Sequence, residues 1–595
     1  MRMEVERPKP AEAPRAAIFD VLETELAANF EALSTEAPDG PAYFLAYDLI
    51  GREDLWLEAR DGAVIKSHTD HDRALDVDVR VGDYQLDNSH GQGGNYAGNG
   101  LGAGLVVAKG DDPLSLAQSL WYATEFQYRM AVDALEAAES SEATRAGGDG
   151  PDHPDFSEET SVERYLPWVE LDLPALAKRW EAPLASASAR LADSPEVLDS
   201  TVALQVSVRN HAYLNSEGSR AQYGSAHLRI MLSVTGQAED GMVLERFRSF
   251  DVHSPEQLPE PGALDLAADE LRKELLALRD APVAEPYTGP AVLEGPAAGV
   301  FFHEIFGHRL EGHRQKDDLE GQTFTRMVGK RVLPPFLDVF DDPRVAVLNG
   351  TPLFGHYQID DEAVPAQSAT LVDKGELEGF LLGRSPVLPF EHSNGHGRRE
   401  TGHQVVARQG NLIINAQHTV PEGKLREHLI ATAKRADKPY GLWFSDIQGG
   451  YTITDRSGPQ AFKVLPLMVY RVWTDGRPDE LVRGVDIVGT PLSAFETLTA
   501  AGDEPGIFNG MCGAESGWVP VSAVSPSVLL SKIEIERASN DRQRPPLLTP
   551  PTEAGVEGKA PERQVPADAK AIRRWSSVPG DASDASDASV EGGRP

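Results

Sequence analysis

The amino-acid sequence predicts an α+β protein, in which an N-terminal α/β domain precedes a β-rich C-terminal domain with a barrel-like or sandwich-like core. Two observations support this prediction. Residues 15–289 mix amphipathic helical patterns with alternating strand patterns. Within residues 290–539, the part beyond a predicted helix that ends at Leu310 consists mostly of short strand patterns joined by hairpin signals, and one further helical pattern, at 422–436, interrupts them.

The N-terminal domain contains four stretches in which apolar residues recur every three or four positions, at 18–33, 114–139, 173–191 and 264–279. This spacing predicts amphipathic helices. Residues 201–209 alternate apolar and polar side chains, and a turn at 215–218 leads to a predicted partner strand at 227–234. Shorter strands are expected at 43–47 and 75–81. Residues 138–164 are acidic and rich in glycine and proline, which indicates a linker or a long surface loop.

A glycine run at 88–104 contains Gly98-x-Gly100-x-x-Ala103, which formally satisfies a dinucleotide-binding fingerprint. That fingerprint requires a hydrophobic strand directly before it, whereas a polar glycine-rich stretch precedes it here. We therefore expect a mobile loop, and a nucleotide-dependent oxidoreductase is the weaker interpretation, to be tested by NAD(P) binding.

In the C-terminal domain, a short strand at 291–293 precedes a helix that should run from Gly295-Pro296 through Leu310, since proline suits a first helical turn. Hairpin turns are predicted at Lys374-Gly375 and Asp475-Gly476. Residues 1–14 and 540–595 are predicted to be disordered; the long tail is too polar and proline-rich to bury a core.

Composition narrows the classes of partner. The chain of 595 residues has 56 Lys and Arg against 93 Asp and Glu, a net charge of −37, which disfavours nucleic acid and anionic membrane surfaces. Its single cysteine excludes an intrachain disulfide. We see no signal peptide and no apolar run long enough for a membrane helix, so a cytoplasmic protein is expected.

The most informative motif is His303-Glu304-x-x-x-His308, within FFHEIFGH on the predicted helix. Neutral imidazoles bind zinc, and an adjacent carboxylate can take a proton from zinc-activated water and return it to a leaving amine. The motif therefore predicts that His303 and His308 bind Zn²⁺ and that Glu304 is a general base. The competing interpretation is two hydrogen-bonded histidines on a half-buried helix.

The spacing of the two histidines requires a distorted helix. Residues five apart lie about 140° apart around an ideal helix, whereas the common four-residue spacing gives about 40°. A π-bulge absorbs one extra residue, and Gly307 would lower the cost of such a distortion. We therefore expect a bent or over-wound helix at 304–308.

The residues alone leave two interpretations of Cys512 open, a third zinc ligand or a buried apolar residue. Cys512 lies between glycines in FNGMCG, and a thiolate is an excellent zinc ligand, but a lone cysteine is more often a small buried apolar residue. The histidines of EHSNGHGRRETGHQ could be mistaken for a second metal site. We instead expect a polar loop there, whose Arg398 and Arg399 contact substrate or a partner.

At these residues the chain resembles the TldD/PmbA family of metallopeptidases, in its metal-binding TldD-like branch. The resemblance is carried by stretches spread over the C-terminal half and by one earlier stretch, NSEGSR at 215–220. The C-terminal stretches are HEIFGHRLEGH (303–313), DDEAVPAQSATLVDKGELEGFLLGR (360–384), SNGHGRRE (393–400), RGVDIVGTPLSAFETL (483–498) and NGMCGAESGWVPVSAVSPSVLL (509–530).

The resemblance implies that His303, His308 and Cys512 are the zinc ligands and that Glu304 is catalytic. It also implies a peptidase for unfolded or small peptides, such as precursors of modified peptides, held as an added strand. Members form a homodimer, or a heterodimer with a metal-free paralogue, around an enclosed chamber. Arg309 and Ala514-Glu515-Ser516 depart from the family pattern, and Trp518 adds bulk nearby.

The main alternative is a non-catalytic peptide-binding or assembly subunit in which the zinc is structural. Three protein ligands beside a free glutamate argue against it, because structural zinc usually has four protein ligands.

Overall fold

The computed structural model describes residues 3–9, 11–35, 37, 40–91, 104–144, 153–316, 320, 322–452, 462–489 and 494–538. The chain divides into a compact unit, Met1–Gln543, and a second unit, Arg544–Pro595, which lies outside the described residues. The predicted disorder of the tail and most of the predicted mobile glycine run, residues 92–103, also fall outside them. The compact unit has the predicted α+β architecture.

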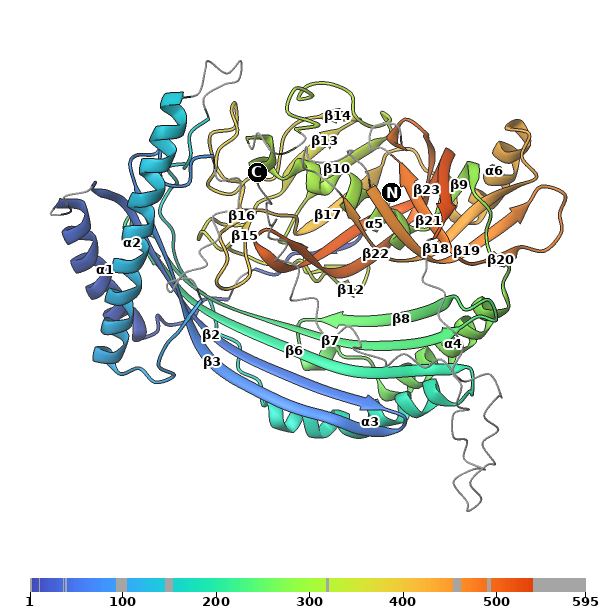
Figure 1. The fold of residues 1–595 in the computed structure, drawn as a ribbon, viewed down its shortest axis with the longest axis horizontal. Helices are drawn as coiled ribbons and strands as arrows, with labels where there is room; N and C mark the ends of the chain where they lie inside the picture. The colour runs from blue at the N-terminus through green and yellow to red at the C-terminus, as the bar shows by residue number, and fades with distance from the viewer. Residues whose placement is uncertain are drawn as a thin grey trace, which may run out of the picture. The chain divides into compact units, whose positions relative to one another are not determined.

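The N-terminal half forms one sheet, in the order β4-β3-β2-β6-β7-β5, with β8 pairing with β7. Its longest strands run side by side in Figure 1. The strands are β2 (Ala42–Arg60), β3 (Ala63–Val81), β4 (Leu105–Val106), β5 (Glu163–Tyr165), β6 (Val197–Asn215), β7 (Arg220–Gln237) and β8 (Val243–Val252).

Four helices cover this sheet where the helical patterns predicted them. They are α1 (Ile18–Thr35), α2 (Pro113–Thr144), α3 (Leu173–Ala192) and α4 (Pro261–Asp280). α3 and α4 lie together on one face of the long strands (Figure 1). They bury an apolar stripe that includes Trp180 and Leu271. Burial of such a stripe is the main stabilising contribution of an amphipathic helix.

Three sequence-based expectations were wrong in this half. The stretches 43–47 and 75–81 belong to strands of 19 residues each, β2 and β3. Residues 138–144, assigned to a linker, continue helix α2. Part of the predicted disordered N-terminus is ordered: β1 (Val5–Glu6) pairs with β11 (Val347–Leu348), and Arg7 forms an ion pair of 2.9 Å with Asp342.

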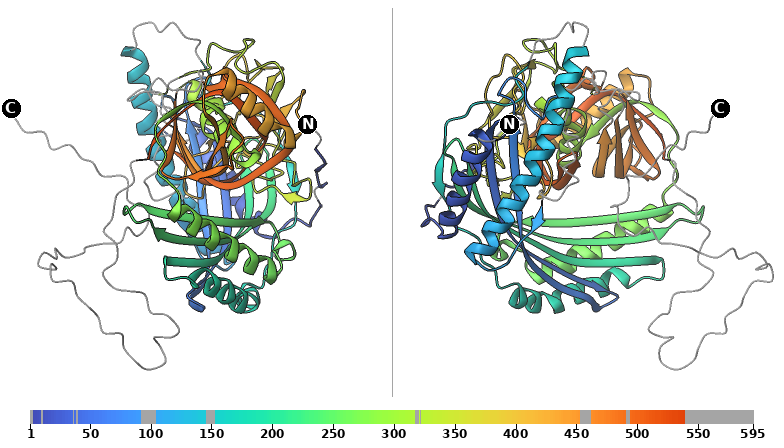
Figure 2. Two further views of the ribbon diagram at one scale, coloured as in Figure 1. Left: turned by 90° about the vertical axis from the view of Figure 1, so that its right-hand side faces the viewer. Right: turned by 60° about the vertical axis from the view of Figure 1, so that its left-hand side comes forward.

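The C-terminal half forms an eleven-stranded sheet, part of which closes on itself. The strands are β9 (Tyr287–Leu293), β10 (Leu337–Asp341), β13 (Ala369–Asp373), β14 (Glu376–Leu377), β17 (Asn411–Ala416), β18 (Tyr440–Thr452), β19 (Phe462–Trp473), β20 (Glu480–Val482), β21 (Val485–Gly489), β22 (Leu498–Ala514) and β23 (Gly517–Arg537). β23 pairs with both β21 and β9, so the series β23-β21-β19-β18-β9 is a closed ring, seen in Figure 2 (left). The predicted barrel-like core is therefore present.

Smaller elements complete this half. They are β12 (Thr351–Pro352), β15 (Gly397–Arg398), β16 (Val406–Ala407) and α6 (Glu422–Arg435). The hairpins predicted at Lys374-Gly375 and Asp475-Gly476 form between β13 and β14 and between β19 and β20. Among the described residues, no helix combines the length and the apolar character needed to cross a bilayer.

Helix α5 (Gly295–Ile305) packs against β9, β18, β19, β22 and β23. Phe301 and Phe302 are both fully buried, as expected for a helix that is apolar on all sides. At Gly299, a Cβ atom would lie 2.8 Å from the backbone oxygen of Ala523, so the helix approaches β23 very closely. This packing fixes the position of the helix end that carries His303.

Candidate metal centre

Three side chains from separate elements meet in the C-terminal half. His303 lies near the end of α5, His308 lies in the 3₁₀ turn η2 (Gly307–Leu310), and Cys512 lies on β22. The sulfur of Cys512 is 3.3 Å from Nε2 of His303 and 3.4 Å from Nε2 of His308. All three residues are buried. The structure thus brings together the residues that the sequence nominated as metal ligands.

A break in the helix makes this convergence possible. α5 ends at Ile305, Phe306 has φ −110° and ψ −53°, and the 3₁₀ turn begins at Gly307. The two imidazole rings consequently lie 4.9 Å apart between centroids, at an interplanar angle of 77°. The expected distortion at 304–308 is present. It is a change from α-helix to 3₁₀ turn, however, and neither the π-bulge nor a helix continuous to Leu310 is found.

Gly307 is required for a different reason than the one expected. A Cβ atom at this position would collide with the side-chain amide of Gln409. That amide is buried, and its Nε2 donates to the backbone oxygen of His303 at 3.4 Å. The missing side chain of Gly307 therefore makes room for a residue that contacts the end of α5.

The electrostatics of the three side chains favour a cation. Burial raises the pKa of the Cys512 thiol, but His308 and His303 outweigh it and bring that pKa well below its ordinary value. Burial lowers the pKa of His308, but Cys512 and Glu311 outweigh it and raise that pKa well above its ordinary value. A thiolate and a carboxylate therefore stabilise positive charge between them, and a divalent cation can take the place of the imidazole proton.

Glu311 lies behind His308, away from the sulfur. Both of its carboxylate oxygens are 3.2 Å from Nδ1 of His308, and the side chain is fully buried. Burial would raise the pKa of Glu311, but His308 and Arg314 outweigh it and lower that pKa to about 2. An ionised carboxylate at this place accepts the Nδ1 proton of His308 and leaves Nε2 free to bind a metal.

Arg408 connects the two sides of the cluster. Its guanidinium donates to the backbone oxygen of Cys512 at 2.7 Å and lies 3.6 Å from Glu311. The residue is fully buried. No local pattern in the sequence indicates this contact, because Arg408 is about a hundred positions from both residues. Glu311, by contrast, follows His308 by three positions and was overlooked within the motif.

The donor set fits zinc. Zinc bonds of about 2.3 Å to sulfur and about 2.0–2.1 Å to nitrogen, at tetrahedral angles, place sulfur and nitrogen about 3.6 Å apart. The observed separations of 3.3 and 3.4 Å are close to this value. Among the described residues, these three form the group of potential metal-binding side chains whose ligand atoms all lie within 4.8 Å of one another. Tetrahedral zinc held by them would keep one position open.

Glu304 differs from its neighbours in exposure. Every residue from Phe301 to His308 is buried except Glu304, which is half-buried. This residue therefore retains access to solvent beside the buried His303. That combination is what a proton carrier needs at the edge of a metal site.

Comparison with known proteins identifies the family. Residues 286–537, which contain all four of these residues, match the PmbA/TldA metallopeptidase C-terminal domain. Over these residues the chain belongs to the TldD/PmbA family. Metalloprotease TldD homolog of Haemophilus influenzae is 27% identical over 274 residues, which cover 45% of this chain and 52% of that protein. A metalloprotease of Methanothermobacter thermautotrophicus is 26% identical over 370 residues, or 60% of this chain and 73% of that protein.

The fold has solved counterparts. TldE from Thermococcus kodakarensis superposes with a TM-score of 0.56 at 12% identity, covering 87% of this chain and all of that chain. At this identity the likeness concerns the fold alone. The match to the Haemophilus influenzae protein spans about half of that protein's length.

Two residues that depart from the TldD/PmbA pattern, Arg309 and Glu515, make hydrogen bonds or ion pairs within the protein. Arg309 donates to the backbone oxygens of Ile305 and Glu304 at 3.1 and 3.4 Å, and so satisfies carbonyl groups at the end of α5. Glu515 hydrogen-bonds to His313 and pairs with Arg314 at 2.8 Å. Both departures support the segment around His308 and leave the three nominated ligands in place.

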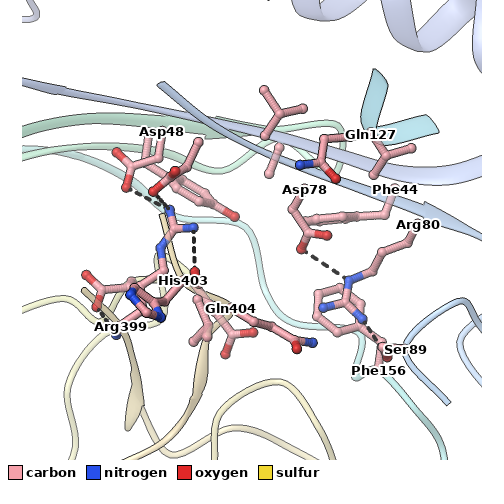
Figure 3. Close-up of a pocket in the computed structure, with 18 of the residues that line it drawn as sticks. Phe44, Asp48, Asp78, Arg80, Ser89, Gln127, Phe156, Arg399, His403 and Gln404 are labelled. Carbon is pink, nitrogen blue, oxygen red and sulfur yellow. Dashed lines mark hydrogen bonds and ion pairs between the residues drawn. The ribbon is translucent and has the colours of Figure 1, made fainter. Parts of the chain in front are cut away.

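Arg398 and Arg399, predicted to contact substrate, make contacts within the protein. Arg398 donates to the backbone oxygens of Gln409 and Pro520 at 2.8 and 2.7 Å. Arg399 lies 3.2 Å from both Asp48 and Asp76 of the N-terminal sheet. These ion pairs border a small pocket of about 90 Å³, which shares no lining residue with the metal cluster (Figure 3). A substrate-binding role for the two arginines stays a prediction.

The histidines of the polar loop do not gather into a second metal group within the described part of the chain. His396 is buried and lies 3.3 Å from Asp341, whereas His392 is largely exposed. His403 borders the pocket of Figure 3. His356, elsewhere in this half, hydrogen-bonds to the backbone oxygen of Pro343 at 2.8 Å.

Two larger cavities adjoin the strand that carries Cys512. One, of about 880 Å³, is lined by the consecutive residues 246–252 of β8 and 507–511 of β22. Consecutive lining residues mean that the edge of each strand borders the cavity, since the side chains of a strand alternate between its faces. Among the described residues β8 pairs only with β7, and the segment 507–511 of β22 pairs only with β23; the isolated bridge from β22 to Val420 lies at Gly502, outside this segment. The other cavity, of about 860 Å³, lies between the N-terminal sheet and the β22–β23 hairpin.

Proposed function

We propose that the protein is a zinc metallopeptidase that hydrolyses unfolded or small peptides. The observation that carries this proposal is the convergence of His303, His308 and Cys512 at separations suited to zinc, beside the half-buried Glu304. Zinc bound there would supply a Lewis acid that lowers the pKa of water toward 7 and polarises a peptide carbonyl.

Residues of the chain bind the ion, orient one of its ligands and transfer the proton. His303, His308 and Cys512 hold the ion, and Glu311 holds His308 in the tautomer whose Nε2 faces the sulfur. Glu304 accepts the proton of the attacking water and delivers it to the nitrogen of the leaving amine. The metalloprotease names of the relatives support this assignment.

The cavity between β8 and β22 supports an extended peptide as substrate. A peptide that runs along the free edge of β22 can form main-chain hydrogen bonds with it, which hold a substrate without requiring a particular sequence. The same strand carries Cys512. We extend the proposal to a dimer, either of two copies or with a metal-free relative.

Substitution of the general base tests the proposal. Glu304→Gln should retain about one zinc per chain by elemental analysis and lose cleavage of a denatured, fluorescently labelled peptide. The wild-type protein should cleave this peptide, and a chelator should stop cleavage. His303→Ala should lose the zinc. If Glu304→Gln cleaves as fast as wild type, the assigned role is refuted. If zinc-loaded wild type does not cleave at all, a structural zinc in a peptide-binding subunit is the better account.

A further inference from the structure

The β22–β23 hairpin carries different side chains on its two faces. Cys512 pairs with Val519 across the hairpin, and both are buried, at 7% and 2% exposure. Their neighbours Met511, Gly513 and Trp518 are exposed. Because successive side chains of a strand point to opposite faces, Met511 and Trp518 lie on the face opposite the metal cluster.

Met511 and Trp518 are unusually exposed for large apolar residues, at 40% and 56%. Both line the cavity of about 860 Å³ and also the cavity of about 880 Å³. They therefore lie where the two cavities adjoin. Met511 is next to Cys512 in the sequence, Trp518 is next to its cross-strand partner Val519, and the β22 edge of this hairpin borders the larger cavity. Neighbouring exposed apolar side chains in a concave site indicate a binding surface.

The indole of Trp518 is held in place although it is exposed. Gly513 lies opposite Trp518 in the hairpin, and a Cβ atom at Gly513 would be 3.0 Å from three atoms of the indole ring. The ring thus lies directly over the glycine. The backbone N–H of Trp518 donates to Glu400 at 2.9 Å, which fixes the start of β23. A ring positioned before binding loses little conformational entropy when a ligand packs on it.

The charged side chains that border the cavity of about 880 Å³ are held in ion pairs. Arg246 forms ion pairs with Glu274 and with Asp446, at 2.5 and 2.6 Å, and Arg229 pairs with Asp251. A charged side chain of a peptide would have to compete with these pairs. An apolar or aromatic side chain gains contact with Met511 and Trp518 without breaking any of them.

We propose that Met511 and Trp518 form a subsite that selects peptides bearing a large apolar residue, above all an aromatic one. The proposal rests on the proposed peptide substrate, since it assigns one side chain of that peptide to the face of the hairpin opposite Cys512. Main-chain contacts with β22 would hold any extended peptide, and this subsite would add a preference among peptides.

Direct binding tests the subsite independently of cleavage. The zinc-loaded full chain carrying Glu304→Gln is titrated against two fluorescein-labelled decapeptides of Gly, Ala and Ser that differ only in a central Phe or Ser. The Phe peptide should bind roughly tenfold more tightly, a difference in line with aromatic contact plus apolar burial. Adding Trp518→Ala should remove this preference and leave the affinity for the Ser peptide within about twofold of its value before the substitution. Adding Trp518→Phe instead should leave most of the preference for the Phe peptide in place.

A matched control uses Trp121 on α2, which is 58% exposed and far along the chain from the hairpin. Trp121→Ala should leave both affinities unchanged. Equal weakening of both peptides by Trp518→Ala, or an intact preference, overturns the subsite. A preference that depends on Trp518 in a protein whose wild type does not cleave peptides supports the subsite and contradicts the peptidase. Cleavage by wild type, without any preference between the two peptides, supports the peptidase and contradicts the subsite.

Discussion

Glu311 lies outside the motif His303-Glu304-x-x-x-His308 but contacts its second histidine. Its two oxygens face Nδ1 of His308, and Arg314 and Arg408 lie on its other sides at 2.9 and 3.6 Å. The carboxylate therefore determines which nitrogen of His308 is available to a metal ion. A ligand imidazole that lacks such a partner is free to adopt the wrong tautomer or to turn away.

Substitution of Glu311 by glutamine should weaken zinc binding by roughly 10- to 100-fold, because the carboxylate that orients His308 is lost. Competition with a fluorescent zinc chelator measures this change, and the visible spectrum of the Co²⁺-substituted protein reports whether His308 still binds. Glu515→Gln is the control: it also removes a half-buried carboxylate partner of Arg314, and Glu515 contacts none of the three nominated ligands. Wild-type zinc affinity in Glu311→Gln would show that Glu311 does not position the ligand.

At the residue scale, the sequence predicted the four residues at the centre of the site but not the residues that support them. His303, Glu304 and His308 share one short motif, and the family resemblance added Cys512. Arg408 and Gln409 approach the site only through tertiary contacts, so no local pattern marks them. Gly307 was noticed, but its steric reason depends on Gln409 and could not be seen in the sequence.

Helix α5, which carries His303, packs very closely against β23. A Cβ atom at Gly299 would lie 2.8 Å from the backbone oxygen of Ala523, and backbone cannot move aside as a flexible side chain can. The helix and β23, the strand paired with β22, are thereby held at a fixed distance. The position of His303 relative to Cys512 depends on that distance.

Gly299→Ala should therefore destabilise the protein by about 1–3 kcal/mol, the usual cost of overpacking, despite the better helix propensity of alanine. The midpoint of urea unfolding measures the change. Gly262→Ala on α4 is the matched control, since a Cβ atom there meets nothing within 4 Å and should raise stability by about 0.4–1 kcal/mol. Similar effects of the two substitutions would contradict the close approach of α5 to β23.

At the scale of elements, amphipathic helices were predicted well and long strands poorly. α3 and α4 place apolar residues at regular helical spacing, and both were found within a few residues of their predicted ends. Residues 51–54 of β2 and 66–73 of β3 have no large apolar side chain on either face, so alternation is absent where the strands continue. Only long-range pairing with neighbouring strands keeps these segments extended.

On the scale of the whole compact unit, buried ion pairs join the N-terminal and C-terminal halves. Arg384 forms a two-pronged pair with Glu217 at 2.7 and 2.8 Å, and its side chain is only 1% exposed. Arg399 joins the same sheet through Asp48 and Asp76. Such pairs fix orientation because a buried charge that loses its partner is strongly unfavourable.

Arg384→Met should destabilise the protein by roughly 3–5 kcal/mol, because Glu217 would remain largely buried without its partner. Urea unfolding followed by tryptophan fluorescence measures the effect. Arg477→Met removes a pair of the same chemistry, with Asp475, on the surface, and should leave the midpoint unchanged. An equally small effect of Arg384→Met would mean that this pair does not stabilise the joined halves.

X-ray absorption at the zinc edge tests the central claim most directly, because it reports the ligands of the bound ion in the full chain. The account predicts about one zinc per chain, with one sulfur at about 2.3 Å and two imidazole nitrogens at about 2.0–2.1 Å. A zinc shell without sulfur, or with several sulfurs shared between chains, would contradict the site formed by His303, His308 and Cys512.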